Sequence, residues 1–349
     1  MIECIFTIDY EIYGNGQGSL RELVFEPARK LIAVFEEWNV RFVNFVEVAE
    51  LQKIEAASTD EASADVRRQI REMFIRGFEI ALHLHPQWCK ASFQNGTWLL
   101  DYSEYNLCNL PRQRIVEIVE GAVAYLQDVV GDDDYSPISF RAGNWLLQPS
   151  GCAASVLAEN GIRIDSSVFK GGLQRSHGLD YRPARRNGYY WNFQDDVNAE
   201  DALGSLLEIP IHTEMVPFWR MITCKRLGLQ QKSNAATQEV NGLKKRQRLN
   251  RVWDHLRFRY PLKFDFCRMT LEELTITVDR IIRLDQKSPA SFKPLVAIGH
   301  TKDLEDFETI KRFLAYLRHK GVRVSTLQEI HEKCERPTSL GEQANCSSG

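Results

Sequence analysis

The chain has 349 residues, of which 44% are hydrophobic and 26% are charged, and its formal net charge is −3 at pH 7. This composition is typical of a soluble globular protein with a full core, and the lack of a positive balance argues against nucleic acid as a partner. No apolar run approaches the ~20 residues of a membrane span, and no basic segment of a signal peptide opens the chain. The eight cysteines are scattered, so we expect free thiols and a cytoplasmic protein.

Strand and helix patterns alternate along the chain. The expected elements, in chain order, are a strand from residue 2, a helix at 24–40, a strand at 41–46, a helix at 63–77, a strand at 78–84, a helix at 112–131, a strand at 137–142, a helix at 150–161, strands at 161–164, 206–211 and 295–299, a helix at 304–321, a strand at 322–325 and a helix at 327–334. Such alternation, with nearly continuous apolar strands, predicts a parallel sheet covered by helices. In a barrel of this kind the active site lies at the C-terminal strand ends.

Two regions depart from the alternation. Residues 214–268 are an insertion in which the stretch Lys225–Lys263 has eleven lysines and arginines against two acids. Interleaved apolar residues predict a cationic, partly amphipathic helix there, which is either a solvated face or a contact for an anionic part of the substrate or a membrane surface. Residues 335–349 are small and polar, so we expect a disordered tail after a domain at 1–334.

Acidic and imidazole side chains follow two of the strands. Asp9 and Glu11 are two positions apart at the end of the first strand, and so are His83 and His85 after the strand at 78–84. Side chains at i and i+2 of a strand share one face. The two carboxylates alone could be a metal site, an acid–base pair or a polar rim. Together with the two histidines they have the composition of a catalytic metal site with open positions.

Further polar and aromatic residues stand at or after strand ends. Arg141 is either a functional cation or half of a surface salt bridge, and Asp165 is either a site residue or a turn residue. His300 follows an apolar strand, and its ordinary pKa suits a general acid. Trp88 and Trp145 offer aromatic faces to a sugar ring or pack in the core.

In chain order, the segments TIDYE, FEIALHLHP, FRAGNW, IDSSV and IGHTKD resemble the five motifs of the polysaccharide deacetylase superfamily. The resemblance extends from about residue 2 to residue 330, without the basic insertion. It implies a distorted, partly open (β/α) barrel and a metal-dependent carbohydrate esterase. The most similar subgroup is linked to surface-glycan synthesis.

The resemblance also implies roles for individual residues. The general base is Asp9, the metal ligands are Glu11, His83 and His85, the arginine that pairs with the base is Arg141, the fourth motif contains Asp165, and the acid that protonates the leaving amine is His300. This sequence departs from the family pattern at Tyr10, where most members have a second aspartate, and at Gln87, where the second histidine usually stands.

These observations predict a metal-dependent hydrolase that removes an N-acetyl or similar acyl group from an amino sugar or glycan intermediate. It would use one divalent cation, with zinc favoured over manganese, iron, nickel or cobalt. Opposite protonation states of Asp9 and His300 would give a bell-shaped pH profile. The alternatives are hydrolysis of another C–N bond, in a formamide or ring amide, and a non-catalytic module that binds a glycan or an anion.

Overall fold

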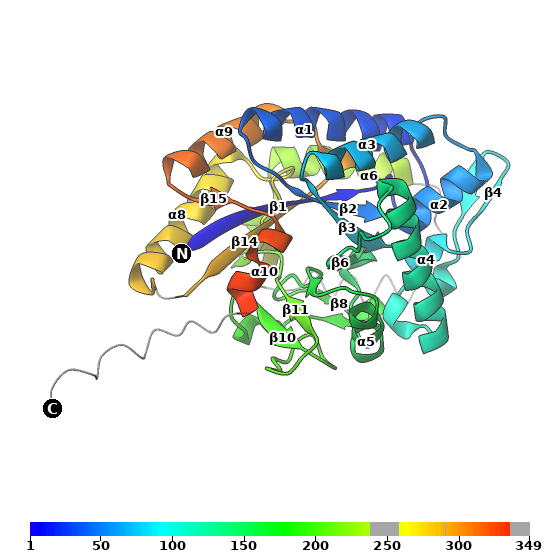
Figure 1. Ribbon diagram of the computed structural model, residues 1–349. Coiled ribbons are helices and arrows are strands. Elements are labelled where there is room, and N and C mark those ends of the chain that lie inside the picture. Colours follow the sequence, from blue (N-terminus) through cyan, green and yellow to red (C-terminus); the bar gives the residue numbers. More distant parts are fainter. Residues whose placement is uncertain (238–257, 290, 336–349) are drawn as a thin grey trace.

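A strongly curled sheet of nine strands forms the centre of the computed structural model, which describes residues 1–237, 258–289 and 291–335 (Figure 1). The strands are β1 (Ile2–Tyr10), β2 (Val43–Glu47), β3 (Glu79–Leu84), β6 (Ser139–Ala142), β7 (Ile164–Asp165), β10 (Trp191–Phe193), β11 (Leu206–Glu208), β14 (Lys293–His300) and β15 (Arg323–Val324). Their order is β10-β11-β7-β6-β3-β2-β1-β14, with β15 also paired to β1. All pairs are parallel except β10–β11. The predicted α/β half-barrel is confirmed.

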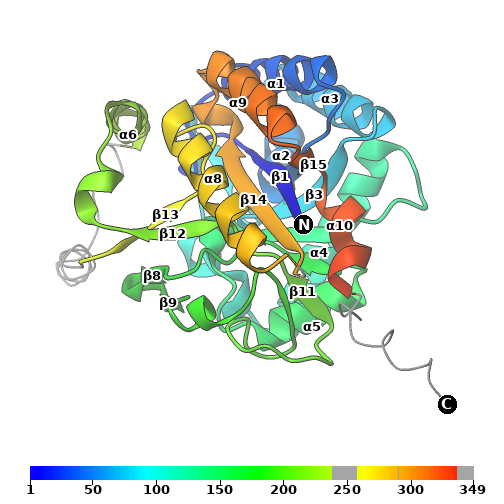
Figure 2. The same ribbon diagram turned by 90° about the vertical axis from the view of Figure 1, so that its left-hand side faces the viewer.

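Helices cover the outer face of the sheet. They are α1 (Glu26–Glu37), α2 (Val48–Ala57), α3 (Ser63–Ile75), α4 (Arg112–Val130), α5 (Gly151–Glu159), α8 (Leu271–Lys287), α9 (Phe307–His319) and α10 (Leu327–Glu335). Both ribbon views show α1, α3 and α9 side by side above β1 (Figures 1 and 2). Among the described residues, no helix has the length and apolar character needed to cross a bilayer.

The alternation of side chains along β1 decides which residues reach the interior of the barrel. Phe6 and Tyr10 point outward to the helices, and the Phe6 ring packs edge-on against Phe35 of α1 with centroids 5.1 Å apart. Thr7 and Asp9 lie on the opposite face. Because the strands of the barrel are parallel, the polar residues at their C-terminal ends meet at one edge of the sheet.

Between β11 and β14 the chain leaves the barrel. There β12 (Thr213–Val216) and β13 (Tyr260–Lys263) pair as a projecting hairpin, and α6 (Cys224–Thr237) lies between these two strands in the chain (Figure 2). Smaller hairpins are β4 (Ser92–Gln94) with β5 (Thr97–Leu99) and β8 (Leu173–Gln174) with β9 (Leu179–Asp180). Most of the predicted cationic helix falls on residues 238–257, and nearly all of the predicted tail falls on 336–349. Both stretches lie outside the described residues.

Candidate active site

Glu11, His83 and His85 form a buried group at the C-terminal ends of β1 and β3. Oε2 of Glu11 lies 2.9 Å from Nε2 of His85 and 3.5 Å from Nε2 of His83. One ligand atom of each residue lies within 4.8 Å of the other two. Nε2 of His83 is buried and has no hydrogen-bond partner among the described residues. An orphaned imidazole nitrogen beside a carboxylate and a second imidazole fits a divalent cation as the missing partner.

Neighbouring groups hold both imidazole rings in place. Nδ1 of His83 lies 2.8 Å from the carbonyl oxygen of Arg141. A proton on Nδ1 can be donated there, which leaves the lone pair of Nε2 free for a metal. Nδ1 of His85 faces the side-chain amides of Gln87 at 3.1 Å and Asn144 at 3.2 Å. Oε1 of Gln87 is itself buried and has no hydrogen-bond partner in the part of the chain that the structure describes. A 180° rotation of that amide would let Oε1 accept a hydrogen bond from Nδ1 of His85 and leave Nε2 of His85 free in the same way.

Asp9 is paired with Arg141 in the interior of the barrel. Nη1 of Arg141 lies 2.5 Å from Oδ1 of Asp9, and the guanidinium also donates to Oγ1 of Thr7 and to the carbonyl oxygen of Ser166, each at 2.9 Å. Burial acts to raise the pKa of Asp9, but Arg141 and the nearby imidazoles hold that pKa below its ordinary value. Asp9 is therefore ionised at neutral pH.

His300 stands beside the second oxygen of Asp9. Its Nε2 lies 3.4 Å from Oδ2 of Asp9. Burial lowers the pKa of His300 to about 4, although Asp9 acts in the opposite direction. The resting imidazole is therefore neutral at pH 7. An imidazole of such low pKa gives up a proton readily once it has received one.

Glu11 is paired with Lys302, which follows β14. Nζ of Lys302 lies 2.7 Å from Oε1 of Glu11 and 3.0 Å from the carbonyl oxygen of Ile12. Burial acts to raise the pKa of Glu11, but Lys302 and His85 hold that pKa well below its ordinary value. Each carboxylate of the site thus has its own cation, Arg141 for Asp9 and Lys302 for Glu11.

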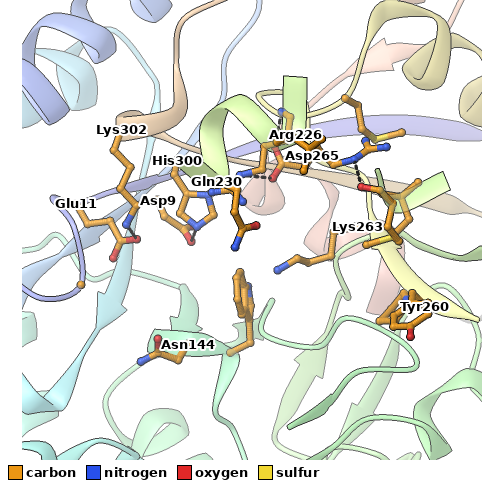
Figure 3. Close-up of a pocket in the computed structure, with 18 of the residues that line it drawn as sticks. Asp9, Glu11, Asn144, Arg226, Gln230, Tyr260, Lys263, Asp265, His300 and Lys302 are labelled. Atoms are coloured by element: carbon orange, nitrogen blue, oxygen red, sulfur yellow. Dashed lines mark hydrogen bonds and ion pairs between the residues drawn. The ribbon is translucent and has the colours of Figure 1, made fainter. Parts of the chain in front are cut away.

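A cavity of about 580 Å³ opens above these residues, a size suited to a small ligand. Its walls include Asp9, Glu11 and His300 on the barrel side and Arg226, Tyr260 and Lys263 on the insertion side (Figure 3). The projecting hairpin and α6 therefore complete the pocket that the barrel begins.

The turn after β6 places a tryptophan in this pocket. Asn144 and Trp145 both have positive φ angles, of 54° and 60°. Two consecutive residues other than glycine in this region are uncommon and cost conformational energy. The turn sets the Trp145 ring edge-on to the His300 ring, with centroids 6.2 Å apart, and sets Asn144 beside His85.

The fold of this chain matches that of several solved structures. No family model matches the chain, and no curated protein matches it in sequence. A Mycobacterium smegmatis protein assigned as a polysaccharide deacetylase superposes with a TM-score of 0.52 at 14% identity, over 98% of this chain and 94% of that chain. A similarly assigned Pseudomonas aeruginosa protein gives 0.50 at 14% identity, over 96% and 93%. Puue allantoinase gives 0.50 at 12% identity, over 96% and 92%. The chain has the polysaccharide deacetylase fold.

Within this deacetylase fold, most of the residues singled out in the sequence lie around one pocket. They are Asp9, Glu11, His83, His85, Trp145 and His300, with Arg141 directly behind Asp9. Trp88 and Asp165 do not line the cavity. Trp88 is fully buried against Trp98, and Asp165 is fully buried and accepts hydrogen bonds from Ser167. Neither side chain reaches a ligand in the pocket unless the structure moves.

Four residues that support the pocket were not singled out as site residues in the sequence. Lys302 pairs with Glu11, Asn144 and Gln87 face His85, and Glu47 accepts a 2.7 Å hydrogen bond from the backbone N–H of His85. Lys302 and Asn144 lie inside the motifs IGHTKD and FRAGNW, so proximity to a motif was the available signal. Nothing in the local sequence around Glu47 distinguishes it from a surface glutamate.

Proposed function

We propose that this protein is a metal-dependent hydrolase that removes an N-acetyl or similar acyl group from an amino sugar or a glycan. The observation that carries the proposal is the convergence of two sets of residues on one cavity. One set is the ligand group Glu11, His83 and His85, and the other is the Asp9–Arg141 pair with His300. The deacetylase fold supports the same conclusion.

The ligand group would hold one divalent cation, and two imidazoles with a carboxylate favour zinc, with manganese, iron, nickel and cobalt as alternatives. When bound, such a cation supplies Lewis acidity to a water molecule and to the amide carbonyl. A second group, Asp9, Glu11 and His300, also satisfies the distance test. Because the first group holds two imidazoles, including the unpartnered Nε2 of His83, we assign the metal to the first group.

The residues of the chain account for the proton transfers. Asp9 accepts a proton from the attacking water, and Arg141 keeps Asp9 ionised until then. His300 is close enough to Asp9, at 3.4 Å, to receive that proton and pass it to the nitrogen of the leaving amine. The products are a carboxylic acid and a free amine, and the base and acid return to their starting states.

The test is a screen of the purified protein, after metal analysis, with acetamido sugars, nucleotide sugars and glycan oligosaccharides. Zinc, cobalt or manganese is added, and release of acetate and of free amine is measured. We expect stoichiometric acetate and amine with at least one acetamido compound. If only a formamide or a ring amide is hydrolysed, that compound class takes the place of the N-acyl amino sugar as the substrate. Tight glycan binding without any hydrolysis would favour the non-catalytic module. Cytoplasmic location stays a prediction.

A further inference from the structure

Lys263, the last residue of β13, extends its side chain into the active-site cavity. In Figure 3 the ammonium group points toward the middle of the pocket, across from Glu11 and Lys302. Nζ lies 3.0 Å from the centre of the Trp145 ring and 5.0 Å from that of Phe169. The contact with an aromatic face fixes the amine but supplies no hydrogen-bond acceptor.

Lys263 differs from the other cations that line the pocket. Lys302 is paired with Glu11, Arg226 with Glu273 at 2.7 Å, and Arg268 with Asp303 at 2.7 Å. Each of these three cations is satisfied by a carboxylate of the protein. Among the described residues, Lys263 alone of the four has no ion pair and no hydrogen bond from its ammonium group.

The carboxylate closest in sequence does not satisfy Lys263. Oδ1 of Asp265 accepts hydrogen bonds from the backbone N–H groups of Cys267 and Arg268, each at 3.0 Å. Burial lowers the pKa of Lys263 to about 7, although Asp265 acts to raise it. A partly buried ammonium without an acceptor is costly for the folded protein. A ligand that brings an anionic oxygen would remove that cost.

We propose that Lys263 is a specificity-determining residue that binds an anionic oxygen group of the substrate. This inference rests on the proposed function and narrows it. The substrate is an N-acyl compound that carries a carboxylate or a phosphate near the scissile amide. The amide lies over Asp9 and His300, and the anionic group lies against Lys263 on the insertion side of the cavity, next to Trp145.

The experiment compares neutral and acidic members of one series: N-acetylglucosamine, N-acetylmuramic acid, which carries a carboxylate, and N-acetylglucosamine phosphates. Binding to the metal-loaded full chain is measured by calorimetry, and turnover by amine release. We expect at least one acidic member to bind more tightly than the neutral sugar. A charged hydrogen bond accounts for a factor of roughly 10 to 100. The two acidic arms distinguish a carboxylate from a phosphate.

Variants of Lys263 test whether this residue causes the preference for the acidic member. Lys263→Met keeps most of the length of the side chain without its charge and should abolish the preference for the acidic member. Lys263→Arg keeps the charge and should retain most of the preference. Lys311→Met removes an exposed lysine of α9, paired with Glu37, and should change nothing. Thermal unfolding confirms that each variant is folded.

Two outcomes would separate the proposals. Equal binding of neutral and acidic members by the folded wild type, or an unchanged preference in Lys263→Met, would overturn the role of Lys263 whether or not the amides are hydrolysed. A preference that depends on Lys263, without hydrolysis of any amide, would confirm the anion-binding role and contradict the proposed reaction.

Discussion

Asp9 and Glu11 are two positions apart on one strand, yet each faces a different cation. Asp9 faces the guanidinium of Arg141, which is completely buried, and Glu11 faces the amine of Lys302 at the edge of the pocket. Glu11 also faces both imidazoles. These surroundings support the proposed roles of Asp9 as the base and Glu11 as a metal ligand.

This division predicts opposite effects of two substitutions. Asp9→Asn should keep the metal and lose activity by roughly a hundred- to ten-thousand-fold, because the general base is gone. Glu11→Ala should lower metal affinity, because one of three ligands is gone. Metal content after dialysis and kcat on the best acetamido substrate are the two measurements. Loss of metal in Asp9→Asn, with retention in Glu11→Ala, would exchange the two roles.

The protonation of Lys263 predicts a pH effect on substrate choice. Its pKa of about 7 reflects burial and the surrounding charges of Asp265, Arg268, Asp9 and Arg141. Since only the ammonium form attracts an anion, the preference for N-acetylmuramic acid over N-acetylglucosamine should fall as the pH rises above about 7. The carboxylate of the ligand stays ionised throughout this range, so its own charge does not contribute.

The matched control for this pH effect is Lys263→Arg, because a guanidinium stays charged over the whole range. The preference of this variant for N-acetylmuramic acid over N-acetylglucosamine should not vary between pH 6 and 9. The ratio of KM values for the two sugars, measured at each pH, checks both expectations. A wild-type ratio that is flat across pH 7 would contradict the assignment.

Among the elements, the turn that carries Asn144 and Trp145 combines strain with function. Asn144→Ala and Asn144→Gly both remove the amide that faces His85, and both should weaken metal binding to a similar extent. Alanine is strained at a positive φ, whereas glycine is not. The free energy of unfolding of Asn144→Ala should therefore be about 1 kcal/mol lower than that of Asn144→Gly. Denaturant unfolding of the two variants measures this difference. Equal stabilities would mean that the turn changes its conformation in the variants.

The elements also show where sequence patterns suffice. The clean apolar stripe at 112–131 predicted a helix that the structure confirms as α4, Arg112–Val130, and the strand expected at 78–84 is β3, Glu79–Leu84. The helix α2 was missed because it follows β2 without a turn residue. Its N-cap is Glu47, which also accepts the backbone N–H of His85. A residue that caps a helix and also accepts a hydrogen bond from the backbone of another strand end has no periodic signature.

The residues of the candidate site also divide into those that the sequence pattern could predict and those that it could not. The residues at strand ends, such as Asp9 and His83, could be predicted because a parallel sheet gathers such ends at one edge. Lys263 and Lys302 could not be assigned, because their contacts depend on where a long excursion and a turn after β14 are placed in space. Trp88 shows the converse: it stands next to a motif, yet packing takes it into the core.

For the molecule as a whole, the balance of charge in the site predicts the effect of removing the metal. Asp9 and Glu11 keep their cations without any metal, and the apolar residues of β1, such as Ile5, Phe6 and Ile8, are fully buried in the core. The chelated protein should therefore keep its far-UV circular dichroism and its cooperative thermal unfolding. Adding zinc back should raise Tm in proportion to the logarithm of its concentration. Loss of cooperative unfolding on chelation would instead show that the metal is part of the folding core.

The projecting excursion departs and returns at adjacent points. The N–H of Phe264 donates to the carbonyl oxygen of His212 at 2.8 Å, and both segments are hydrogen-bonded to β14, through Val296 and Ile298. Because these bonds close the junction, the length and sequence of the excursion can change without displacing the strands that carry Asp9, His83 and His300. We therefore expect relatives that share the strand-end residues but differ in this excursion to catalyse the same reaction on different acyl compounds.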